Sequence, residues 1–128
     1  MKRIDLHIHT VSTSSDSDFT FSTAKLVQYV DTSGLDAIAI TNHNAFNEAQ
    51  FREISTLLTI PAFPGIEINL EKCHLLLISD VANLSEFASM AEKVTQAIRV
   101  PTDSITVDQL KTFFGELRNY VSAHQSHS

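Results

Sequence analysis

A continuous apolar run, Ala-Ile-Ala-Ile at residues 37–40, restricts the fold of this chain more than any other feature of its sequence. A strand with such a run has no polar face, so it is suited to burial on both sides. Parallel sheets that are covered by helices bury their strands in this way. The run therefore predicts an α/β architecture, and the polar residues 41–44, Thr-Asn-His-Asn, mark the end of the strand.

Shorter apolar segments indicate the other strands. Residues 4–9 alternate between apolar and polar side chains with the two-residue period of a strand. Further apolar segments predict strands at residues 60–63, 66–68, 74–79 and 120–124. Pro64-Gly65 is expected to break the chain between the first two of these, because both residues favour turns.

Amphipathic helices alternate with the predicted strands. Apolar residues recur at helical spacing between Ser22 and Gly34, and over residues 51–58, 87–98 and 107–117. Ser22 suits an N-cap, Gly34 a C-terminal stop, and Thr106 with Gln109 a capping box. This alternation predicts right-handed crossovers in an open sheet or in part of a barrel. No linker interrupts it, so residues 1–128 are expected to form one domain.

Composition limits the classes of function. A net charge of -6 and a pI near 5.4 argue against bulk electrostatic binding of polyanions, so phosphate chemistry would need locally held cations. The single cysteine, Cys73, excludes an internal disulfide and fits a reducing cytoplasm. The amino terminus has no apolar signal region, and no apolar run approaches the length of a membrane span. We therefore expect a cytoplasmic protein without a membrane partner.

Residues with metal-binding side chains stand at the ends of the predicted strands: His7, His9, His43, Glu67 and His124. This edge of a parallel sheet is where α/β proteins place their sites. Imidazole and carboxylate groups bind zinc, manganese and iron, and histidines at i and i+2 of a strand point the same way. A carboxylate such as Glu67 can bridge two ions, so the sequence predicts a site for two metals.

Four parts of the chain carry a resemblance to a known family: residues 5–10 (Asp-Leu-His-Ile-His-Thr), 41–44 (Thr-Asn-His-Asn), 65–68 (Gly-Ile-Glu-Ile) and His74. They resemble the PHP family, the polymerase and histidinol phosphatase domain, along nearly the whole chain. The resemblance implies a distorted seven-stranded, TIM-like β/α barrel with up to three metals at its carboxyl face. Phosphoester hydrolysis is the activity that it implies.

Carried over by position, the resemblance implies ligands for three ions. The first would bind His7, His9 and Glu67, and the second Glu67, His74 and His124. The third would bind His43 with an acidic residue of the serine-rich loop, Asp16 by preference and Asp18 otherwise. Asp5 is expected to orient a ligand histidine by accepting its remaining ring proton.

The chain also departs from the family pattern. Asn42 stands where the family commonly has aspartate, and no Asp-x-His pair follows His124. A barrel of these strands would be incomplete, which indicates a fragment, a split protein or the front domain of a longer one. Residues 16–21 and 38–44 are similar to PHP domains that are fused to SMC-like ATPases, so such an ATPase domain or a carboxyl-terminal remainder is an expected partner.

Two functions follow from these observations. The first is a phosphoesterase, acting as a nuclease or as a nucleotide or sugar phosphatase, in which His7, His9, His43 and Glu67 hold two to three Zn²⁺, Mn²⁺ or Fe²⁺ ions that activate water. Its substrate is a phosphoester, with nucleic acid among the candidates. The alternative is a non-catalytic module that is stabilised by metal and serves the assembly or regulation of a larger ATPase.

Overall fold

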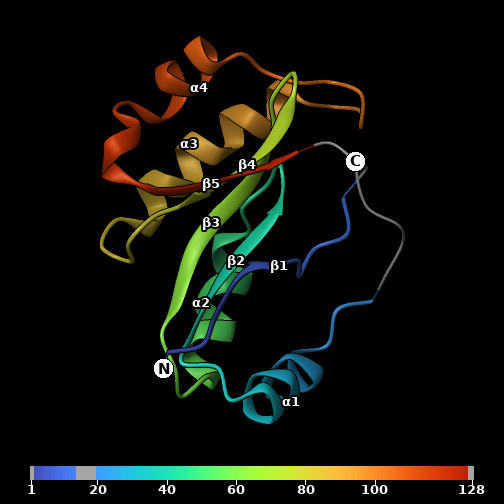
Figure 1. Ribbon diagram of the computed structural model, residues 1–128, viewed down its shortest axis with the longest axis vertical. Helices are drawn as coiled ribbons and strands as arrows, with labels where there is room; N and C mark the ends of the chain where they lie inside the picture. Colours follow the sequence, from blue (N-terminus) through green and yellow to red (C-terminus); the bar gives the residue numbers. More distant parts are fainter. Residues whose placement is uncertain (1, 14–19, 127–128) are drawn as a thin grey trace.

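The computed structural model describes residues 2–13 and 20–126, with residues 124–126 described by their main chain alone. Its centre is one sheet of five strands that follow one another in sequence order (Figure 1). The first three strands are parallel, whereas the fourth is antiparallel to both of its neighbours. The strands are β1 (Ile4–Ile8), β2 (Ala37–His43), β3 (Ala62–Asn69), β4 (Cys73–Ile78) and β5 (Val121–Ser126).

Four α-helices in the described part of the chain pack on the sheet in two groups (Figure 1). The helices α1 (Thr23–Ser33) and α2 (Glu48–Leu57) form one apolar core with β2. The helices α3 (Leu84–Ala97) and α4 (Val107–Phe114) form a second core with β3 and β4. A short 3-10 helix, η1 (Leu117–Asn119), leads into β5. No helix in residues 2–13 and 20–126 has the length and apolar character needed to span a membrane.

The predicted helix ends are confirmed. The Ser22 side chain accepts a hydrogen bond from the Lys25 main-chain N–H, and Gly34 ends α1 in the left-handed region with a φ of 63°. Thr106 and Gln109 form the reciprocal capping box of α4. These signals are local, so they act the same way whatever surrounds the helix.

The predicted break at Pro64-Gly65 is wrong, because β3 runs through both residues. Pro64 has no N–H to donate, but it lies just beyond the last paired residues of the β3–β4 ladder, and its carbonyl accepts a hydrogen bond from the Ser79 N–H. A Cβ atom on Gly65 would lie 2.7 Å from Cγ2 of Thr41 and 3.0 Å from the carbonyl oxygen of Leu77. Gly65 therefore allows β2 and β4 to approach β3 closely, and it makes no turn.

The direction of β4 differs from the simple alternation of parallel strands and helices. Only residues 70–72 separate β3 from β4, which is too short for a crossover and long enough for a hairpin. The hairpin pairs Asn69 with His74, so the first residues of β4 lie at the edge where β3 ends. His74 thereby reaches the same edge of the sheet as the ends of β1 and β2.

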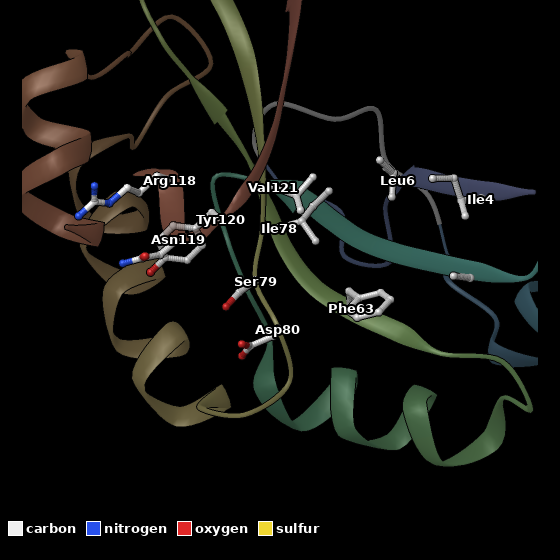
Figure 2. Close-up of a pocket in the computed structure, with 11 residues that line it drawn as sticks. Ile4, Leu6, Phe63, Ile78, Ser79, Asp80, Arg118, Asn119, Tyr120 and Val121 are labelled. Atoms are coloured by element: carbon white, nitrogen blue, oxygen red, sulfur yellow. The ribbon is translucent and has the colours of Figure 1, made fainter. Parts of the chain in front are cut away.

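The sheet is curled like half of a barrel, and its inner face bears an apolar pocket of about 440 Å³ (Figure 2). Side chains from all five strands line it: Ile4, Leu6, Ala37, Phe63, Ile78 and Val121. Residues of η1 and the start of the segment after β4 complete the wall. This architecture agrees with the expected α/β class and with part of a TIM-like barrel.

Candidate metal centre

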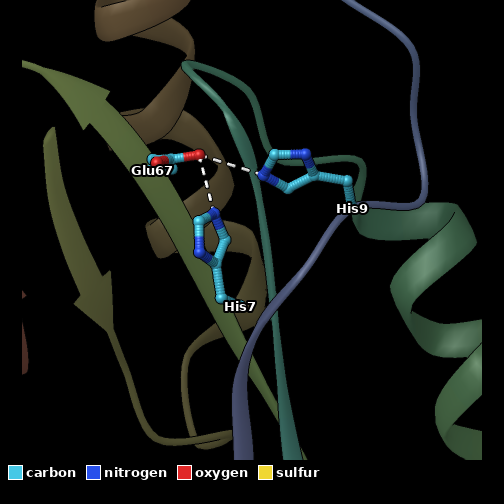
Figure 3. A group of neighbouring side chains, drawn as sticks. All are labelled: His7, His9 and Glu67. Carbon is cyan, nitrogen blue, oxygen red and sulfur yellow. Dashed lines mark hydrogen bonds and ion pairs between the residues drawn. The ribbon is translucent and has the colours of Figure 1, made fainter. Parts of the chain in front are cut away.

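A buried carboxylate, Glu67, lies at the centre of a group of histidines. Glu67 is 1% exposed and stands near the carboxyl end of β3. Its Oε1 atom is 3.0 Å from Nε2 of His7 and 3.0 Å from Nε2 of His9 (Figure 3). His43 approaches the same oxygen at 2.9 Å through Nε2, and His74 approaches Oε2 at 3.2 Å through Nδ1. Four imidazoles therefore surround one carboxylate.

The strand pairing explains why these residues meet. His43 is the last residue of β2 and pairs with Glu67 across the β2–β3 ladder. His7 lies in β1 and His9 just beyond it, and the two-residue spacing turns both toward Glu67. The hairpin supplies His74 from the opposite strand direction. Residues that are distant in sequence thus converge at one edge of the sheet.

The imidazole rings also pack on one another. The ring centroids of His7 and His9 are 4.9 Å apart, those of His9 and His43 4.5 Å, and those of His43 and His74 5.8 Å. The His7 and His74 side chains at the two ends of this row are 33% and 29% exposed. The cluster is therefore open to solvent at its rim while its carboxylate is buried.

Glu67 keeps a negative charge in this setting. Burial raises the pKa of its carboxyl group, but hydrogen bonds from His43, His9 and His7 outweigh burial, so the pKa lies far below its ordinary value of 4.5. A buried anion of this kind needs compensating positive charge or donors. Either the imidazole N–H groups or bound cations can provide it.

The donor set fits divalent metal ions. Two groups of ligand atoms, one from His7, His9 and Glu67 and one from His43, Glu67 and His74, each lie within 4.8 Å of one another. Separations near 3 Å match two ligands of one ion with metal–ligand bonds of roughly 2.1 Å. Glu67 belongs to both groups and offers a different oxygen to His74 than to the other histidines. This arrangement suits a carboxylate that bridges two ions.

Two asparagines that the sequence analysis did not identify as supports hold the loops around the cluster. Oδ1 of Asn42 accepts hydrogen bonds from the main-chain N–H groups of Thr10 and Val11, and its Nδ2 donates to Oγ1 of Thr10. Asparagine suits this position because an amide supplies both acceptor and donor. The bonds fix the chain directly after His9.

Asn44 is the second supporting asparagine. It is buried and has a φ of 53°, in the left-handed region that few residues other than glycine adopt. Its N–H donates to the Glu67 carbonyl at 2.7 Å, and its Oδ1 accepts from the Asn69 N–H at 2.9 Å. Asparagine tolerates this conformation better than most residues. An asparagine directly after a predicted strand was therefore the sequence signal for this turn. Asn44 thus fixes the turn after His43 against β3.

Three further site residues were predicted: Asp5, Asp16 and His124. Asp16 lies outside the described residues. The main chain of His124 pairs with Leu75 across the β4–β5 ladder, but its side chain lies outside the described part, so its role as a ligand stays a prediction. Asp5 accepts hydrogen bonds from the His7 main-chain N–H at 3.0 Å and from the Tyr29 hydroxyl at 2.6 Å. Its expected contact with a histidine ring stays a prediction.

Two solved structures share this fold. A protein from Bifidobacterium adolescentis that is described as a metal-dependent phosphoesterase is 25% identical, with a TM-score of 0.53 over 75% of this chain and 34% of its own. An amidohydrolase from Chromobacterium violaceum, with bound sulfate and no metal, is 20% identical, with a TM-score of 0.51 over 74% of this chain and 34% of its own. The chain thus spans about a third of the length of each. No family profile and no curated protein matches the sequence.

Proposed function

We propose that the chain is the metal-binding part of a phosphoesterase of the PHP type, with β1–β5 as strands of a seven-stranded barrel. One observation carries the proposal: a buried, ionised Glu67 lies within hydrogen-bonding distance of four imidazoles. The likeness to a described metal-dependent phosphoesterase supports it. The residues that would hold ions are those of the two ligand groups, with Asp16 and His124 as further proposed ligands.

The chain's own residues prepare the site for hydrolysis. Divalent ions held there would supply a bound water of lowered pKa and positive charge for the phosphate oxygens. Glu67 stays charged and fixed by burial, and the imidazoles stand around it in a preset geometry. The Cys73 side chain packs against the core that α3 and α4 form with β3 and β4, and the proposed chemistry uses no cysteine nucleophile.

The substrate class is proposed to be a phosphomonoester or phosphodiester, from a nucleotide, a sugar or nucleic acid. The net charge of -6 disfavours attraction of such anions by the surface as a whole. Metal ions bound at the candidate metal centre would attract the anionic substrate to that site. Zn²⁺, Mn²⁺ and Fe²⁺ are the proposed ions because histidine-rich donor sets suit them.

The decisive experiment measures hydrolysis of p-nitrophenyl phosphate and bis-p-nitrophenyl phosphate by chelator-treated protein, before and after addition of Mn²⁺ or Zn²⁺. We expect the protein to hydrolyse these esters only after metal is added. The metal-dependent activity should fall by a factor of at least about 100 in Glu67→Gln. Glu53→Gln, which removes an exposed carboxylate on α2, should retain full activity. Hydrolysis that persists in chelator, or hydrolysis of p-nitroacetanilide instead of phosphoesters, would refute the proposal.

A second candidate function is a metal-stabilised module that assembles with other polypeptide, such as a carboxyl-terminal remainder or an SMC-like ATPase domain. The apolar pocket on the inner face favours it, since apolar concave surfaces of this size are typical of interfaces. This candidate predicts that Mn²⁺ raises the melting temperature while the chain hydrolyses no phosphoester. His7→Ala would then lower the metal-induced stabilisation and leave no activity to lose.

A further inference from the structure

We infer that Arg99 and the pocket it shares with His43 bind the anionic group of the substrate beside the candidate metal centre. The inference rests on the proposed function, and it adds a side chain that selects phosphate-bearing ligands. The pocket has a volume of about 370 Å³ and is separate from the apolar pocket of the inner face. Its lining consists of Thr13, His43, Asn44, Ala45, Thr95, Ile98 and Arg99.

The pocket adjoins the metal centre through one side chain. His43 lines it, and Nε2 of the His43 ring lies 2.9 Å from Oε1 of Glu67. A ligand in the pocket would therefore touch a ring that is also a candidate metal ligand. Arg99 supplies the only formal charge among the described lining residues, apart from what a protonated His43 would add. The pocket consequently favours an anion.

The position of Arg99 is tied to that of His43. Oγ1 of Thr95, in the last turns of α3, donates a 2.7 Å hydrogen bond to the carbonyl of Asn44. Asn44 follows His43 directly and is itself bonded to Glu67 and Asn69. Arg99 comes four residues after Thr95, just beyond the end of α3. The helix that leads into Arg99 is thus anchored to the turn that follows His43.

The guanidinium of Arg99 keeps most of its hydrogen-bonding capacity. The nearby carboxylate of Asp103 accepts hydrogen bonds from the main-chain N–H groups of Arg99 and Val100, so it stabilises the loop after α3. Nε of Arg99 donates to the Gln96 carbonyl at 3.1 Å. The two terminal nitrogens have no hydrogen bond or ion pair to any residue in the ranges 2–13 and 20–126. A planar pair of donors of this kind suits two oxygens of a phosphate group.

Isothermal titration with inorganic phosphate tests the inference on the Mn²⁺-loaded protein. We expect Arg99→Ala to weaken phosphate binding about tenfold or more, and Arg99→Lys to weaken it less, because lysine keeps the charge and loses the paired donors. Arg118→Ala is the matched control, since Arg118 lines the apolar pocket and its loss changes the net charge equally. Phosphate affinity should be unchanged in this control, and Mn²⁺ affinity in all three variants.

The outcomes separate this inference from the proposed function. If Mn²⁺ binds while Arg99→Ala and the wild type bind phosphate equally, the Arg99 site is refuted and the phosphoesterase proposal stands. If the wild type binds none of Mn²⁺, Zn²⁺ and Fe²⁺, the phosphoesterase proposal fails, and the same titration on metal-free protein decides whether Arg99 binds phosphate. Melting curves identify a folding defect, which is not expected because Arg99 is exposed.

Discussion

At the scale of single residues, the candidate site depends on the protonation state of Glu67. Its pKa is depressed because His43, His9 and His7 hydrogen-bond to the carboxylate more strongly than burial disfavours the charge. A group whose pKa is lower in the folded state than in the unfolded chain stabilises the fold above its unfolded pKa. That stabilisation is lost as the pH falls from the unfolded value toward the folded one.

Metal-free protein should therefore show an acid-dependent stability that comes from Glu67. We expect the difference in free energy of unfolding between the wild type and Glu67→Gln to be constant above the ordinary pKa of 4.5 and to shrink as the pH falls below it. Urea unfolding from pH 7 down to pH 3 measures this difference. If the difference in free energy of unfolding stays the same across this pH range, the hydrogen bonds from the histidines do not lower the pKa of Glu67.

At the scale of elements, β3 is the strand on which the site depends, and Gly65 determines how closely its neighbours approach. Gly65→Ala should lower the free energy of unfolding by about 1–3 kcal/mol, because the new methyl group would meet Thr41 and Leu77. The double variant Gly65→Ala with Thr41→Ser removes the Cγ2 atom in the way, so it should recover part of the loss. Urea denaturation measures both, and a neutral Gly65→Ala would contradict the close packing of the three strands.

The elements also show what could be predicted from the sequence. Helix ends and strand positions were predictable because caps and apolar periodicity act over a few residues. The convergence of His7, His9, His43 and Glu67 followed from one rule about the carboxyl ends of parallel strands. The continuity of β3 through Pro64 was not predictable, because it depends on where the pairing of β3 with β4 ends. The supporting bonds of Asn42 and Asn44 join loops that are distant in sequence, so no local pattern reveals them.

At the scale of the whole molecule, the helices cover the outer face of the curled sheet while the inner face stays apolar and open. Ile4 and Val121, which line opposite edges of the inner pocket, are 57% and 61% exposed. Burial of such side chains stabilises a complex by about 25 cal/mol for each Å² of apolar surface removed from water. Burial of the inner face against another polypeptide would therefore be favourable.

This exposure has a measurable consequence for the chain on its own. The inner pocket should bind the aromatic, anionic dye 1-anilinonaphthalene-8-sulfonate in the native state, with saturable fluorescence and an intact melting transition. Val121→Glu places a negative charge in the pocket and should reduce binding of the anionic dye several-fold, whereas Val100→Glu, at an exposed valine outside it, should not. Equal dye binding by both variants would locate the apolar surface elsewhere. Reduced binding in Val121→Glu alone would locate the exposed apolar surface on the curled inner face.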